Sequence, residues 1–197
     1  MRFWQNYAAL LRSHTRGGPT AVLRRFTWEG LQTMLGGAVG SYALLAMHVE
    51  SVEEFDGVAV IKCWKSRPCW GGICFGSVIL GDERIQAKVN NPLFMHEFGH
   101  TLQSRATGPI YLFKYGIPSV LSVRGSGKHN QHPVERDANL RAFEYFKTQP
   151  GFSPWPAANN PLPKSGVTMG IHWWEFLPPL FPVAHLYVAI RDRNGVE

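Results

Sequence analysis

The most constraining feature of this 197-residue chain is the segment His96-Glu97-Phe98-Gly99-His100, because its spacing has a chemical meaning only on an α-helix. Residues four apart lie one turn above each other on the same helical face, so both imidazoles can reach one ion. Glu97 is offset by about 100° from His96, near enough to reach a water molecule at the metal without ligating the metal. Imidazole is among the commonest zinc ligands. The motif therefore predicts a helix with two zinc ligands, His96 and His100, and one general base, Glu97.

The flanking residues supply the start and end of that helix. Asn91 is a good N-cap and Pro92 suits the first turn, so we expect a helix from Pro92 to about Ser104. Gly108-Pro109 closes the segment.

A metal site of this type needs a third protein ligand. The metzincin motif would have Gly and His where this chain has Gln103 and Ala106, so a metzincin ligand set is excluded. A glutamate from a second helix is the alternative, and Glu135 lies just inside a helix predicted from Pro133 to about Lys147. Asn139 lies four residues later on the same face, where its carbonyl oxygen can accept the free ring N–H of a ligand histidine.

Other polar residues are weaker candidates for the site. His129 and His132 precede Glu135 and are alternative ligands, although histidines before a helix are usually solvated or capping. His172, Tyr111 and Tyr115 are candidates to stabilise an oxyanion, and a packed aromatic cluster is the competing interpretation for all three.

The combination of H-E-x-x-H with a downstream E-x-x-A-N resembles the glutamate-type zincins, notably the prenyl-protein and HtpX-type zinc endopeptidases. The stretch Gly71 to Phe146 is also similar to a group of small bacterial H-E-x-x-H proteins through H-E-F-G-H-T-L-Q-S, G-P-I-Y-L-F, G-I-P-S and E-R-D-A-N. The resemblance implies a zincin fold in which His96, His100 and Glu135 bind Zn²⁺ and Glu97 is the general base.

Two departures from that resemblance matter. Asn139 stands where the family has aspartate, which removes a negative charge beside a ligand and lowers its basicity. The chain also lacks the clear transmembrane helices of the HtpX-type enzymes, so membrane-embedded proteolysis is not implied.

The order of elements predicts an α+β fold. We expect a zincin-like domain in which the motif helix packs beside a small β-hairpin or sheet, with a second ligand-bearing helix and a Pro-rich C-terminal wrap. Asp56-Gly57 is a turn signal. The remaining expected elements are helices over residues 3–12 and 27–47, a hairpin of strands 58–64 and 73–80, and an irregular Pro-rich stretch over 150–182.

Charge divides the chain into a basic N-terminal arm, residues 1–28, and a single domain, residues 29–197. The arm has five arginines and no acidic residue, whereas the formal charge of the whole chain is only +6. A nearly neutral body excludes a nucleic-acid-binding domain and leaves contact of the arm with a membrane surface open. The segment 31–49 is interrupted by polar residues, so we expect a buried core helix and no membrane span.

The three cysteines, Cys63, Cys69 and Cys74, do not make a disulfide framework. We expect buried thiols in a reducing, cytoplasmic compartment, with one local bridge as the alternative. Peripheral membrane attachment and export within a larger chain remain open.

These features together predict a zinc-dependent hydrolase, a metallopeptidase that acts on a peptide or protein substrate lying along residues 73–80. The alternative is a zinc-stabilised, catalytically weak binding or effector module.

Overall fold

The computed structural model describes residues 2–46, 48–63, 71–123 and 132–153. These residues form a mixed α+β fold, which confirms the α+β part of the predicted fold class. His129, His172, Cys69 and all but the first four residues of the predicted Pro-rich stretch 150–182 lie outside the described residues. The elements are α1 (Arg2–Thr15), α2 (Gly18–Phe26), α3 (Gly30–Leu45), β1 (Val49–Phe55), β2 (Val58–Cys63), β3 (Gly72–Phe75), β4 (Val78–Gly81), α4 (Pro92–Thr107), a 3-10 turn η1 (Gly108–Ile110), a π-helical turn η2 (Leu112–Gly116), α5 (Ile117–Val123) and α6 (Pro133–Phe146).

The four strands form one sheet in the order β1-β2-β4-β3. Strands β1 and β2 make an antiparallel hairpin through Asp56 and Gly57, both at positive φ, where the sequence predicts a turn. Strand β4 pairs in parallel with β2, so that Ala59 lies opposite Val78.

The predicted hairpin between residues 58–64 and 73–80 is therefore wrong. The apolar run 73–80 divides at Gly76, which has φ +63°, and folds back so that β3 pairs antiparallel with β4. A Cβ atom on Gly76 would lie 2.8 Å from Cγ of Gln32, so the turn also needs glycine for space. The polar segment just before the Asp56-Gly57 turn, in which we expected no strand, supplies most of β1.

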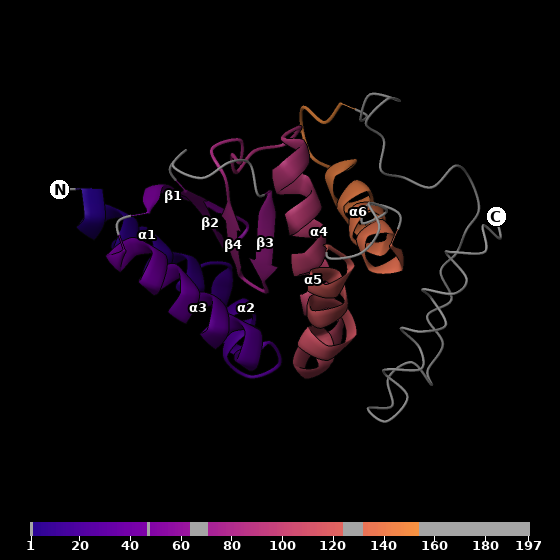
Figure 1. Cartoon of the computed structure of the whole chain (residues 1–197), viewed down its shortest axis with the longest axis horizontal. Helices are drawn as coiled ribbons and strands as arrows, with labels where there is room; N and C mark the ends of the chain where they lie inside the picture. Colours follow the sequence, from indigo (N-terminus) through magenta and orange to yellow (C-terminus); the bar gives the residue numbers. More distant parts are fainter. Residues whose placement is uncertain (1, 47, 64–70, 124–131, 154–197) are drawn as a thin grey trace.

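Helices cover both faces of the sheet (Figure 1), and this explains why β2 and β4 are apolar on both sides. Residues Ala59 and Ile61 face a core formed with α1 and α3, whereas Val58 and Val60 face a core formed with α4 and α6. The edge strand β3 contacts α3 and α4.

The N-terminal segment packs on this sheet. Leu10 of α1 is buried in the first core. The buried guanidinium of Arg25 donates hydrogen bonds to the carbonyl oxygens of His14 and Arg16, which ties α2 to the end of α1. Among the described residues, no helix combines the length and the apolar character needed to cross a membrane.

Helix α3 is buried on one face only. Gly36 and Gly40 let it approach the sheet closely, because a Cβ atom on either would meet neighbouring side chains at 2.9 Å. Its outward residues are also apolar and exposed, so the expectation of a buried core helix holds only for the face that packs on the sheet. Cys63 and Cys74 are free thiols, and Cys74 is buried.

Candidate metal centre

Helix α4 begins as its sequence predicts. The Asn91 side chain accepts a hydrogen bond of 2.9 Å from the Phe94 amide, and Pro92 occupies the first turn. Phe94, Met95 and Phe98 are fully buried in the core between α4, α6 and the sheet. Because these three anchor one face of α4, the two histidines of the motif are held on the side that faces α6.

Helix α6 packs along α4 at very short range. His132 caps its start, since the ring accepts a hydrogen bond from the Val134 amide at 3.3 Å. Ala138 and Ala142 are fully buried between the helices. On α4, a Cβ atom at Gly99 would overlap the main-chain carbonyl of Ala138. Small residues on both helices therefore allow the approach that brings α6 side chains to the motif.

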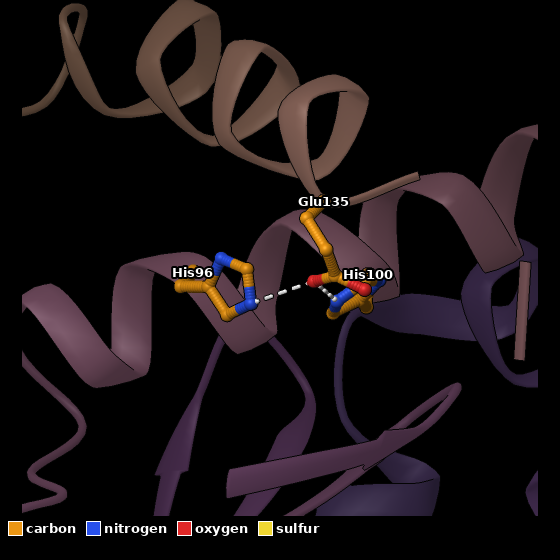
Figure 2. Close-up of side chains that lie close together, drawn as sticks. All are labelled: His96, His100 and Glu135. Atoms are coloured by element: carbon orange, nitrogen blue, oxygen red, sulfur yellow. Dashed lines mark hydrogen bonds and ion pairs between the residues drawn. The ribbon is translucent and has the colours of Figure 1, made fainter. Parts of the chain in front are cut away.

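The two histidines and Glu135 converge on one point (Figure 2). Oε2 of Glu135 lies 3.1 Å from Nε2 of His96 and 3.1 Å from Nε2 of His100. The three ligand atoms all lie within 4.8 Å of one another, and Glu135 is fully buried. Ligands at 2.0–2.1 Å from a tetrahedral zinc ion are separated by about 3.3 Å. The spacing of Glu135 from each histidine is close to that value.

The other ring nitrogens are held by amide oxygens. Nδ1 of His96 lies 2.8 Å from Oδ1 of Asn139, and Nδ1 of His100 lies 2.8 Å from Oε1 of Gln103. The orientation of Gln103 is fixed, because its amide nitrogen donates to the Val134 carbonyl at 2.9 Å and to the Asp137 carboxylate at 2.8 Å. An amide oxygen only accepts hydrogen bonds, so both Nδ1 atoms carry a proton.

This tautomer has an electrostatic consequence at the centre. In a neutral imidazole protonated at Nδ1, the Nε2 atom is a lone-pair acceptor. Two such atoms facing one carboxylate oxygen would repel it, unless a cation lies among them. The donor set therefore requires either a metal ion or protons on the histidines, and two imidazoles with one carboxylate suit Zn²⁺.

The ionisation of these three side chains shows the same demand for positive charge. Burial opposes protonation of His96, but hydrogen bonding to Glu135 and the nearby carboxylates outweigh it and raise the pKa of His96 to about 9. Burial likewise opposes protonation of His100, and hydrogen bonding to Glu135 again raises its pKa. Burial disfavours the charged form of Glu135, yet both histidines hold its pKa well below the usual range.

Glu97 is buried on the same side of α4, against the edge strand. A Cβ atom on Gly72 would lie 2.7 Å from both Cγ and Oε1 of Glu97, so the strand accommodates this carboxylate only because it has glycine there. Burial raises the pKa of Glu97. Glu97, both histidines and Glu135 line a cavity of about 650 Å³. The rest of the wall is mostly apolar and comes from Leu35, from residues 72–75 of β3 and from residues 111–121.

The oxyanion candidates have different positions. Tyr111 lines the cavity, and its hydroxyl donates to the Cys74 carbonyl at 3.4 Å. Tyr115 is buried against Tyr111 and Val134 and does not line the cavity. Burial raises the pKa of both phenols, and both belong to a packed cluster, as the competing interpretation expects. His132 acts as a helix cap, which is the ordinary role of a histidine at that position.

Sequence reasoning missed Gln103 and Gly99. Gln103 was considered only as a position where a metzincin would have glycine, although it lies three residues after His100 and so on an adjacent part of the same helical face. Gly99 lies inside the motif, and a glycine in a helix interior usually marks a close approach of another chain segment. The position of Gln103 after His100 and the glycine inside the motif are therefore the sequence signals for these two residues.

Comparison with known protein families, with curated proteins and with solved structures finds no match to this chain. The resemblance to glutamate-type zincins therefore remains a prediction.

Proposed function

We propose that His96, His100 and Glu135 bind a zinc ion and that the protein is a zincin-like zinc-dependent hydrolase, a metallopeptidase. The observation that carries this proposal is the convergence of Nε2 of His96, Nε2 of His100 and one carboxylate oxygen of Glu135, all within 4.8 Å of one another. Asn139 and Gln103 fix the tautomers that create this arrangement. A group of three acceptors at these distances is stabilised by a cation.

An open coordination position favours a catalytic role over a structural one. Structural zinc sites have four protein ligands, whereas catalytic sites have three and leave one position for water or substrate. Within the part of the chain that the structure describes, the candidate group has three members, and all three line the cavity. When bound, zinc would supply a Lewis acid that lowers the pKa of water and polarises a carbonyl.

Glu97 is the residue placed to move the proton. Its carboxylate lines the same cavity as the three ligands, and burial with a raised pKa brings it closer to the range of an effective general base. In the proposed reaction Glu97 takes a proton from water as the carbon–oxygen bond forms. It then delivers that proton to the amide nitrogen as the carbon–nitrogen bond breaks. One water is consumed, and a carboxylic acid and an amine are released.

The edge strand β3 provides the substrate side of the cavity. Residues 72–75 contribute to the wall beside α4, and β3 is at the edge of the sheet. An edge strand offers main-chain groups to an extended peptide. We predicted that the substrate lies along residues 73–80. Only the β3 part of this run can pair with a substrate, because β4 lies in the interior of the sheet.

The proposal is tested by zinc quantification together with cleavage of an unbiased peptide library, on the wild type and on Glu97→Gln. We expect both proteins to hold one zinc per chain and only the wild type to cleave, with at least a hundredfold loss in the variant. Leu140→Gln, a change at an exposed position of α6, is the matched control and should retain activity. Zinc binding without cleavage by the wild type would favour the binding or effector module instead.

A further inference from the structure

One outward surface of the protein is apolar over two helical segments. On α3, every exposed side chain is apolar: Leu31, Met34, Leu35, Ala38, Tyr42 and Leu45. The spacing of three or four residues makes these a stripe along the outward face. Met34 and Tyr42 are more than 70% exposed, which is high for large apolar side chains. We call this stripe, together with the segment described next, the α3–α5 face.

The second segment is η2 with α5. Phe113, Ile117, Val120 and Leu121 are each about half exposed. These four residues also line the cavity of the candidate metal centre, as does Leu35 of α3. The stripe on α3 and the exposed residues of α5 therefore meet where the cavity opens. Figure 1 shows α3 and α5 on either side of β3.

The N-terminal segment that packs against α3 is basic in sequence. Helices α1 and α2 contact α3, and residues 1–28 contain five arginines without an acidic residue. Arg2 and Arg12 are exposed, as is Arg16, whose guanidinium lies 3.7 Å from the Glu54 carboxylate. Exposed aromatic and aliphatic side chains of α1 and α2 lie among them, at Trp4, Leu11, Leu23 and Phe26. Aromatic and aliphatic groups with interspersed arginines are typical of surfaces that insert into the headgroup region of an anionic bilayer.

The small residues of α3 argue against a second copy of the chain as the partner. Gly36 and Gly40, which would allow two helices to approach closely, are used inward against Val78 and Ile61. Ala38 is the one small residue among the exposed side chains of α3, and a symmetric pair would bring two arginine-rich segments together. A lipid surface with anionic headgroups can bury the apolar side chains of the α3–α5 face and attract the arginines of the N-terminal segment.

We propose that the α3–α5 face docks the protein on an anionic lipid surface, with α3 lying in the headgroup region. Each flanking arginine adds electrostatic attraction to the surface, and the apolar stripe supplies the insertion. The opening of the cavity then faces the bilayer. If the proposed function holds, substrate reaches the metal centre from the lipid surface. Only this statement about substrate rests on the proposed function, and the docking itself does not.

The test is flotation of the full chain with vesicles of phosphatidylcholine alone and of phosphatidylcholine with phosphatidylglycerol. We expect binding to the anionic vesicles, and a fall of at least about tenfold in partitioning for the double variant Met34→Glu/Tyr42→Glu. Leu140→Glu places one glutamate on an exposed apolar position of α6, outside the α3–α5 face, and should leave binding unchanged. Arg2→Gln/Arg12→Gln should weaken binding to anionic vesicles only.

Zinc content is measured on the same preparations, so that a failure of the metal site is seen separately from a failure of docking. Both positions of the double variant are exposed, and a circular dichroism melt checks that it folds. If the wild type binds neither kind of vesicle, the proposal is overturned. Equal loss of binding in Leu140→Glu also overturns it, as does a dimer in light scattering that Met34→Glu/Tyr42→Glu abolishes.

Discussion

Gly99 of α4 lies directly against the main chain of Ala138 in α6, so closely that a Cβ atom on Gly99 would overlap the Ala138 carbonyl oxygen. Glu135 and Asn139 flank Ala138 on α6 and contact the two motif histidines on α4. The separation of the helices at this one point therefore controls the geometry of the proposed metal centre.

The change Gly99→Ala should move α6 away from α4. We expect a loss of about 1–3 kcal/mol in the free energy of unfolding, as for other overpacked sites, and a fall in zinc affinity of at least about tenfold. Urea unfolding and zinc titration measure the two effects. Gly37→Ala is the matched control, because a Cβ atom there has its nearest neighbour at an ordinary 3.8 Å. The control should be stabilised by about 0.5–1 kcal/mol through helix propensity. Equal zinc affinity in both variants would contradict the importance of the helix contact.

The change Gly72→Ala should displace Glu97 and leave the metal ligands in place. The new methyl group would meet Cγ and Oε1 of Glu97 at 2.7 Å. Under the proposed function we expect one zinc per chain with a loss of at least about tenfold in peptide cleavage. Cleavage rate and zinc content are measured on the same preparation. Loss of zinc, or an unchanged rate, would show that Gly72 does not position the base.

The change Gln103→Leu should weaken zinc binding although Gln103 is not a ligand. It removes the oxygen that holds Nδ1 of His100 and the two bonds that tie α4 to α6. Loss of such a partner typically lowers metal affinity by about 10–100-fold. Isothermal titration with zinc measures this, and Gln86→Leu, outside the site, serves as the control. An affinity equal to that of the wild type would remove Gln103 from the account.

These residues show what the sequence could predict of the site. The motif spacing, the Asn91-Pro92 start and the interval between Glu135 and Asn139 are local helical properties, and the corresponding contacts lie where those properties indicate. The contact of Gln103 with His100, three residues earlier on α4, is also local. Its bonds to Val134 and Asp137 depend on how α4 and α6 pack, which no local pattern contains.

The sheet, too, has features that local sequence predicts and features that depend on long-range packing. The Asp56-Gly57 turn follows from the conformational preferences of those two residues, and it is where the structure has it. The parallel pairing of β2 with β4 depends on which strands become neighbours, and the apolar run 73–80 is compatible with one strand or with two. For α3, polar residues within segment 31–49 favoured a buried core helix over a membrane span, whereas only its Gly36 and Gly40 side packs on the sheet.

The pH dependence of stability should reflect Asp82. Hydrogen bonding from Arg84 is the main cause that holds the pKa of this buried carboxylate below its ordinary value, and the Gly71 amide also donates to it. A lowered folded-state pKa adds stability above the unfolded-state pKa of about 3.9, and this stability is lost as the pH falls through the folded-state pKa. We expect Asp82→Asn to lose about 1–3 kcal/mol at pH 7. In urea unfolding the difference from the wild type should shrink at about pH 3, and a constant difference would contradict this origin.

The central claim is that Glu135 completes a metal site with the two histidines of α4. Equilibrium dialysis against zinc tests it most directly, on the wild type, Glu135→Ala and His132→Asn, since asparagine keeps a cap at the start of α6. The account predicts one tightly bound zinc in the wild type and in His132→Asn, and a loss of at least about a hundredfold in affinity in Glu135→Ala. Wild-type affinity in Glu135→Ala, or no zinc bound to the wild type, would contradict it.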